Sequence, residues 1–131
     1  MTASSGVPRI MLIDDDSDIL SVMTRGLSRH NFAVTGFSDP LMALSEFKAN
    51  QYDMILLDVR MPGMSGFELA KKLWALDPDA KICFFSAFEI QDEEATVVFR
   101  NLKTVGFIRK PITPSELARR IAGYLPPRTA T

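Results

Sequence analysis

The sequence has one cysteine, no excess of basic residues and no long apolar run. The single cysteine, Cys83, excludes an internal disulfide and a multi-cysteine metal site, and it fits a reducing cytoplasm. Lysine and arginine number 15 against 16 aspartates and glutamates, so the charge gives no indication of nucleic-acid binding. No apolar stretch reaches about 18 residues, so no membrane-spanning segment is predicted. The first residues have neither a basic start nor an apolar stretch, and a secretory signal is not expected there.

The 131 residues do contain enough apolar material for one folded core. Hydrophobic residues make up 47% of the chain, which argues against a disordered protein and favours a single domain. Residues 1–8 and 126–131 are predicted to be short tails. The folded domain is therefore expected over residues 9–125.

Short apolar runs alternate with helical patterns five times. The predicted strands are residues 9–13, 32–37, 54–58, 81–86 and 105–109. The predicted helices are residues 17–30, one that begins at Pro40, one that follows Ser65, residues 91–103, and one that begins at Pro114. Apolar strands separated by amphipathic helices indicate a parallel sheet with helices on both faces. The pattern thus predicts an α/β fold with a doubly wound, five-stranded parallel sheet and five helices.

Capping residues mark where these helices begin. The predicted caps are Asp16 or Ser17, Asp39, Ser65 and Thr113. Pro40 and Pro114 then occupy the first helical position, which suits proline. In the helix that begins at Pro40, we expect Leu41, Leu44 and Phe47 to face inward.

Polar residues stand where the apolar runs end. Asp14 and Asp15 follow the first run, Asp58 and Ser86 end the third and fourth, and Lys110 follows the fifth. In a doubly wound sheet, ligands gather at the carboxyl ends of the strands, so these side chains are expected to share one site.

The residue types at this expected site favour phosphoryl chemistry. Converging carboxylates repel one another, and a hard cation such as Mg²⁺, which prefers oxygen ligands, relieves the repulsion. Carboxylates without histidine or cysteine argue against zinc. A carboxylate can also attack a phosphoryl group to give an acyl phosphate, with a lysine and a hydroxyl stabilising the oxygens.

The sequence resembles the receiver domain of two-component response regulators. The resemblance rests on Asp14-Asp15, Asp58 with Met61-Pro62-Gly63 and Gly66, Ser86-Ala87 and Lys110-Pro111, and it covers about Arg9 to Leu125. It implies a flavodoxin-like fold with the strand order 2-1-3-4-5. It also implies a cytoplasmic phosphoprotein that acts as a phosphorylation-controlled switch in a phosphorelay.

The resemblance assigns a role to each residue. Asp58 would accept phosphate from a sensor histidine kinase or a histidine phosphotransfer protein. Asp14, Asp15, Asp58 and the main-chain carbonyl of Arg60 would bind Mg²⁺. Ser86 and Lys110 would bind the phosphoryl oxygens, and Ser86 and Phe107 would be the switch residues. The Lys110–Pro111 bond is often cis in this family.

The implied output is docking rather than catalysis. A downstream protein target would bind the face formed by helix four, strand five and helix five, with no nucleic acid and no membrane bound by this domain. The implied chemistry is limited to the domain's own phosphotransfer and autodephosphorylation, so the chain is not expected to be an enzyme.

Other function classes fit the sequence less well. An aspartate-nucleophile phosphatase needs a second acid two residues after the nucleophile, and Arg60 stands there. A nucleotide or flavin module needs a glycine-rich turn after the first strand, where this chain has Asp14-Asp15-Asp16. A receiver-like interaction domain that never needs phosphate remains a further alternative.

Overall fold

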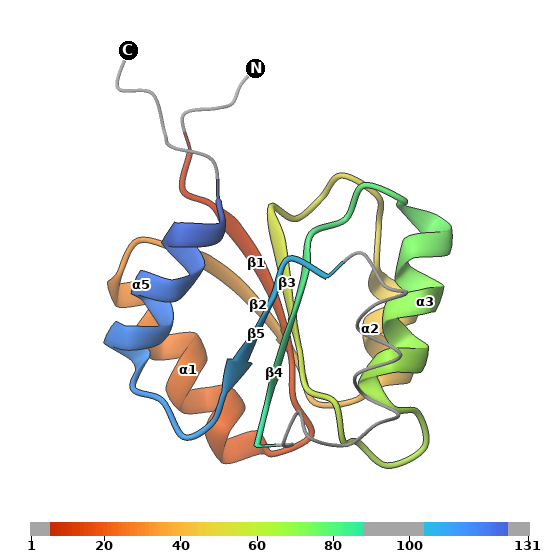
Figure 1. Cartoon of the computed structure of the whole chain (residues 1–131), viewed down its shortest axis with the longest axis horizontal. Coiled ribbons are helices and arrows are strands. Elements are labelled where there is room, and N and C mark those ends of the chain that lie inside the picture. The colour runs from red at the N-terminus through yellow and green to blue at the C-terminus, as the bar shows by residue number, and fades with distance from the viewer. Residues whose placement is uncertain (1–5, 88–103, 126–131) are drawn as a thin grey trace.

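Strands and helices alternate along the chain in the computed structural model, which describes residues 6–87 and 104–125 (Figure 1). The elements are β1 (Arg9–Ile13), α1 (Ser17–Arg29), β2 (Ala33–Phe37), α2 (Pro40–Glu46), β3 (Met54–Leu57), α3 (Gly66–Leu76), β4 (Ile82–Ser86), β5 (Gly106–Arg109) and α5 (Pro114–Tyr124). The predicted helix at residues 91–103 lies outside the described residues. Among the described helices, none is long and apolar enough to cross a membrane.

All five strands form one parallel sheet in the order β2-β1-β3-β4-β5. The order 2-1-3-4-5 implied by the family resemblance is therefore confirmed. β1 lies between β2 and β3, so the carboxyl ends of β1 and β3 are adjacent. Strand order reverses at this point, which is where such sheets bind ligands.

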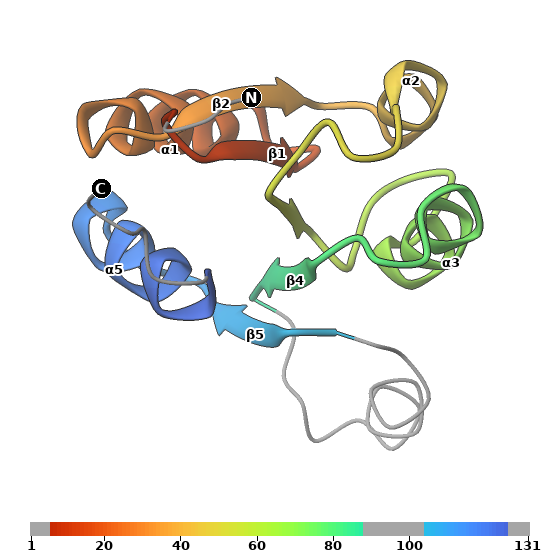
Figure 2. The same ribbon diagram turned by 90° about the horizontal axis from the view of Figure 1, so that it is seen from above.

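Helices cover both faces of the sheet, as predicted for a doubly wound fold. Figure 2 shows α1 and α5 on one face and α2 and α3 on the other. Successive strand residues therefore enter different cores: Met11 and Ile13 join the cluster under α2 and α3, while Ile10 and Leu12 join the cluster under α1 and α5. Because both faces are covered, every residue of β3 is buried. Cys83 lies in β4 and is fully buried, as its place in an apolar run predicts.

The predicted helix starts are confirmed by the capping contacts. Asp16 accepts hydrogen bonds from the N–H groups of Asp18 and Ile19 at the start of α1. Asp39 caps α2, Thr113 caps α5, and a capping box joins Ser65 and Glu68 at the start of α3.

The predicted inward face of α2 is wrong at one position. Leu41 is 62% exposed, whereas Ala43 is fully buried and Phe47 is nearly so. Leu44 is partly buried against the core under α2 and α3. The buried Pro40 sets the inward face, and Leu41 lies about 100° further round the helix, on the solvent side.

Candidate functional site

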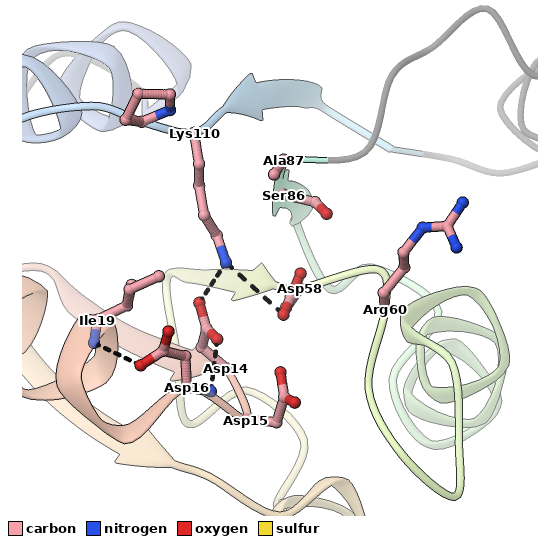
Figure 3. A pocket seen from close by; sticks show the side chains of 10 residues that line it. Asp14, Asp15, Asp16, Ile19, Asp58, Arg60, Ser86, Ala87 and Lys110 are labelled. Atoms are coloured by element: carbon pink, nitrogen blue, oxygen red, sulfur yellow. Dashed lines mark hydrogen bonds and ion pairs between the residues drawn. The ribbon is translucent and has the colours of Figure 1, made fainter.

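Four strand ends bring the predicted site residues to one edge of the sheet (Figure 3). The N–H of Asp14 donates to the carbonyl of Phe37 over 3.1 Å, and the N–H of Asp58 donates to the carbonyl of Ile13 over 2.9 Å. The N–H of Lys110 donates to the carbonyl of Ser86 over 3.0 Å. These backbone bonds continue the sheet by one residue past β1, β3 and β5, so the side chains that follow are fixed by the strands behind them.

The strand ends surround an open pocket of about 570 Å³. Residues of α1 and of the loops after β3 and β5 complete its lining. The lining residues are Asp14, Asp15, Asp16, Ile19, Asp58, Arg60, Ser86, Ala87, Lys110 and Pro111.

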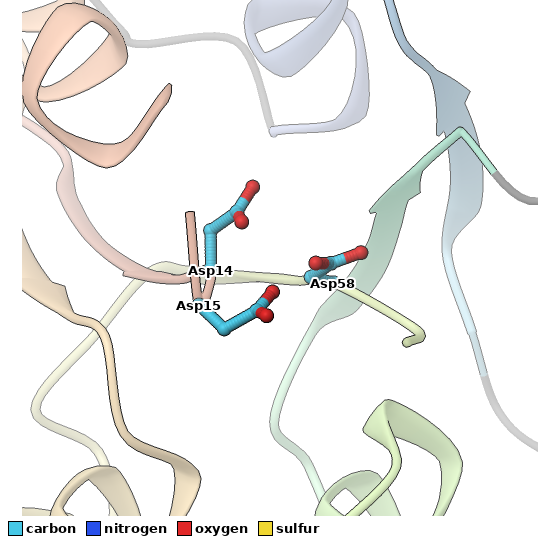
Figure 4. A group of neighbouring side chains, drawn as sticks. All are labelled: Asp14, Asp15 and Asp58. Carbon is cyan, nitrogen blue, oxygen red and sulfur yellow. The ribbon is translucent and has the colours of Figure 1, made fainter. Parts of the chain in front are cut away.

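Three carboxylates converge in this pocket (Figure 4). Asp14, Asp15 and Asp58 each offer an oxygen, and these oxygens lie within 4.8 Å of one another. Asp14 is fully buried and Asp58 is 5% exposed, whereas Asp15 is open to solvent. The cluster is therefore anchored on the protein side and open on one side.

Lys110 supplies the positive charge that these acids face. Its Nζ lies 2.6 Å from Oδ2 of Asp14 and 3.6 Å from Oδ2 of Asp58 (Figure 3). The same Nζ lies 5.0 Å from the centroid of the Phe85 ring, a cation–π arrangement that the sequence reasoning missed. The alternation of side chains along β4 could have indicated this contact. Phe84 and Phe85 face opposite sides of the sheet.

The surroundings of Asp58 make its ionised form costly. Burial, opposed by the positive charge of Lys110, raises the pKa of Asp58 from 3.8 to about 6. The neighbouring acids Asp14 and Asp15 also raise this pKa, whereas a hydrogen bond from Ser86 lowers it. The charge of the Asp58 carboxylate is thus stabilised by one lysine and one hydroxyl and opposed by burial and by the two neighbouring acids.

Asp14 and Asp16 have different tasks although they are neighbours in sequence. Oδ1 of Asp14 accepts the N–H of Asp16 over 2.9 Å, which orients the Asp14 carboxylate toward the pocket. Oδ1 of Asp16 instead caps α1 (Figure 3).

A close approach of α3 fixes the backbone of Asp58. The N–H of Gly66 donates to the carbonyl of Val59 over 2.7 Å. A Cβ added at Gly66 would lie 2.1 Å from the carbonyl oxygen of Asp58, so only glycine fits there. Gly63, with φ of 84°, makes the turn that leads into this contact.

The remaining predicted residues lie at the margins of the site. Arg60 is exposed and lines the pocket, and ligation of a metal by its carbonyl stays a prediction. Phe107 is partly buried against the core under α2 and α3, opposite Phe84 in the ladder. The Lys110–Pro111 bond is cis, as is common in the resembled family.

The donor set suits a hard divalent cation. Among the described residues, the group that could hold a metal ion here consists of three carboxylates. Mg²⁺ prefers such oxygen ligands and keeps several waters, which the open side of the cluster allows. Of this chain's residues, Asp14, Asp15 and Asp58 would hold the ion.

Comparison with known proteins gives one consistent family. A model described as the response regulator receiver domain matches residues 10–122. The transcriptional regulatory protein PrrA of Mycobacterium tuberculosis is 33% identical over 124 residues, which is 95% of this chain and 52% of PrrA. The chain spans about half the length of the first curated relatives it matches.

Solved structures share the fold. The non-phosphorylated HemR receiver domain from Leptospira biflexa has a TM-score of 0.82 at 25% identity, covering 95% of this chain and 98% of that chain. The response regulator protein TrrA from Thermotoga maritima, solved in complex with Mg²⁺-BeF, has a TM-score of 0.75 at 24% identity, covering 90% and 99%.

Proposed function

The chain belongs to the response regulator receiver domain family, and from this membership we propose that Asp58 accepts a phosphoryl group from a sensor histidine kinase or a histidine phosphotransfer protein. The observation that carries the proposal is the shared Lys110, whose Nζ contacts both the buried Asp14 and the adjacent Asp58. An acceptor carboxylate, a second acid and a lysine at one sheet edge are groups that phosphoryl transfer can use.

The proposed transfer uses groups that already surround Asp58. An oxygen of Asp58 attacks the phosphorus of a phosphohistidine, a P–O bond forms, the P–N bond breaks and the imidazole leaves with the electron pair. Lys110 moves from the carboxylates to a phosphoryl oxygen, and the Ser86 hydroxyl donates to another. Mg²⁺ held by Asp14, Asp15, Asp58 and the Arg60 carbonyl would neutralise charge on the carboxylates and on the phosphoryl oxygens.

The proposed switch follows from the new charge. Phosphorylation adds about −1.5 to −2 charge and three acceptor oxygens at Asp58. Ser86, at the end of β4, is drawn toward the phosphoryl group, and Phe107 shifts into the space that Ser86 leaves. The face that includes β5 and α5 then presents a different surface to a downstream protein target.

We propose a switch that catalyses only its own phosphotransfer and autodephosphorylation, with residues 9–125 as the receiver domain and the cytoplasm as its compartment. Arg60, in place of an acid two residues after Asp58, disfavours an aspartate-nucleophile phosphatase. A phosphate-independent interaction domain is disfavoured by the acids and Lys110 in one pocket.

Phosphate incorporation at Asp58 tests the proposal. The protein is incubated with Mg²⁺ and a small acyl-phosphate donor such as acetyl phosphate, and intact mass spectrometry records the added phosphoryl group. The wild type is expected to gain one group and Asp58→Asn none. Asp79→Asn, which changes an exposed acid outside the pocket, is the matched control and should behave as wild type. Undiminished incorporation by Asp58→Asn would overturn the assignment.

A further inference from the structure

We propose that Arg120 is a positioning residue for the phosphoacceptor site, because it ties α5 to the backbone of the strand that delivers Lys110. This inference rests on the proposed function of Asp58 and extends it to a residue outside the pocket. Arg120 lies on α5, and it is absent from the pocket lining.

The connection between α5 and β5 begins with a close contact between Tyr124 and Gly106. A Cβ added at Gly106 would lie 2.4 Å from Oη and 2.5 Å from Cζ of Tyr124. The Tyr124 ring therefore rests directly on the backbone of the first residue of β5. A Cβ at position 106 would require the Tyr124 ring to move, so glycine permits the contact as it stands.

Arg120 converts this contact into a polar connection. Its Nη2 donates to the carbonyl oxygen of Phe107 over 3.3 Å and to Oη of Tyr124 over 3.1 Å. The guanidinium carbon lies 6.0 Å from the centroid of the Tyr124 ring, within the range of a cation–π contact. Because the guanidinium is planar and has several N–H donors, one side chain can hold a strand carbonyl and a phenol oxygen together.

The charge of Arg120 also affects Cys83 on β4. Burial raises the pKa of the Cys83 thiol to about 12, and the nearby guanidinium of Arg120 acts against that rise. Cys83 is the ladder partner of Gly106. Arg120 therefore lies close to the β4–β5 pair on the face that α5 covers.

Only two residues separate Phe107, whose carbonyl Arg120 contacts, from Lys110 in the pocket. Phe107 is followed by the fully buried Ile108, then Arg109, then Lys110. The N–H of Lys110 is bonded to the carbonyl of Ser86, and its Nζ reaches Asp14. A displacement of β5 along α5 thus moves the backbone from which Lys110 enters the pocket, and it moves Phe107 at the same time.

The contacts of Arg120 with Phe107 and Tyr124 are expected to set the rate at which Asp58 takes phosphate. Arg120→Gln should slow the initial incorporation from acetyl phosphate by about 3- to 10-fold. Arg120→Lys, which keeps the charge but loses the planar fork, should recover only part of the rate. Tyr124→Phe keeps the ring on Gly106 and removes only the phenol oxygen, so it should slow incorporation by about 2-fold. This milder variant tests the same contacts between α5 and β5 if Arg120→Gln folds poorly.

A double-mutant comparison separates positioning from general stability. In a Lys110→Gln background, Arg120→Gln should cause no further change in rate, because the residue through which it acts is gone. Arg119→Gln is the matched control: it removes the same charge one residue away, from a side chain that is 72% exposed and paired with Glu116. Arg119→Gln should leave the rate unchanged.

The outcomes distinguish this inference from the proposed function. If the wild type takes no phosphoryl group, both are overturned. If the wild type is phosphorylated and Arg120→Gln matches it, only the positioning role is overturned. Equal fold-changes from Arg120→Gln with and without Lys110 would likewise show that Arg120 does not act through Lys110.

Discussion

At the scale of single residues, Asp58 carries a charge that its surroundings resist. Its pKa is raised from 3.8 to about 6 by burial and by the neighbouring acids. The folded state therefore holds the proton more tightly than the unfolded state, and the carboxylate costs stability once it ionises. That cost appears as pH rises from about 4 to about 6, and it is fully present above that range.

Replacing Asp58 with asparagine should therefore stabilise the metal-free protein. At pH 7.5, we expect Asp58→Asn to raise the free energy of unfolding by about 1–3 kcal/mol. The gain should shrink as pH falls from 6 to 4, where the wild-type carboxyl regains its proton. Urea unfolding with EDTA at several pH values measures it. A constant difference across that pH range would contradict the charge argument.

Lys110 is the counterpart of this unfavourable charge. Lys110→Gln leaves the buried carboxylate of Asp14 without its cation, so we expect a loss of about 2–4 kcal/mol in the free energy of unfolding at pH 7.5. Without the competing ammonium, Mg²⁺ should bind this variant more tightly than wild type. Thermal unfolding with and without Mg²⁺ tests both points. A smaller Mg²⁺-induced rise in Tm for Lys110→Gln than for wild type would show that lysine and metal do not compete.

The sequence predicted which side chains share the pocket where residue type and chain position coincide. Asp14, Asp58, Ser86 and Lys110 stood out because each polar residue ends or follows an apolar run. Arg120 and Phe85 gave no such signal. An arginine on an amphipathic helix looks like a solvated residue, and one of its two partners is a backbone carbonyl that no sequence pattern marks.

At the scale of elements, the approach of α3 to β3 is the contact that shapes the site. Gly66→Ala would place a methyl group against the carbonyl of Asp58, so we expect a loss of about 2–3 kcal/mol in stability and weaker Mg²⁺ binding. Gly123→Ala is the matched control, because a Cβ at Gly123 meets nothing within 4 Å. It should stabilise α5 by ~0.5–1 kcal/mol without altering Mg²⁺ affinity.

Urea unfolding and Mg²⁺ titration of both glycine variants provide the measurements. A Gly66→Ala protein as stable as wild type would mean that α3 can withdraw from Asp58 without cost.

Element starts were predictable because capping depends on local sequence, as at Asp39-Pro40 and Thr113-Pro114. The inward face of α2 was less predictable from the sequence. Leucine at position 41 suggested burial, but α2 is short, Pro40 already occupies the inward position, and the exposed Leu41 follows from helix geometry. A helix of two turns has too few residues for hydrophobicity alone to fix its inward face.

At the scale of the whole molecule, we expect metal binding and folding to be coupled. The acids that would hold Mg²⁺ come from β1 and β3 ends that only the folded sheet brings together. With Mg²⁺ at about one hundred times its dissociation constant, we expect a gain of ~2.7 kcal/mol in the free energy of unfolding. Asp15→Asn should fold normally, because Asp15 is exposed, yet lose most of this gain. Urea unfolding with Mg²⁺ or EDTA provides the test, and an equal gain in Asp15→Asn would remove Asp15 from the ligand set.

The order in which the strands are joined has a consequence for protein synthesis. Asp14 and Asp58 emerge early from the ribosome, but Lys110 and the strand that bears it come near the end of the described chain. A nascent polypeptide that ends before β5 lacks the lysine that contacts Asp14 and Asp58. Under the proposed function, the domain would become able to take a phosphoryl group only after β5 and Lys110 have been translated.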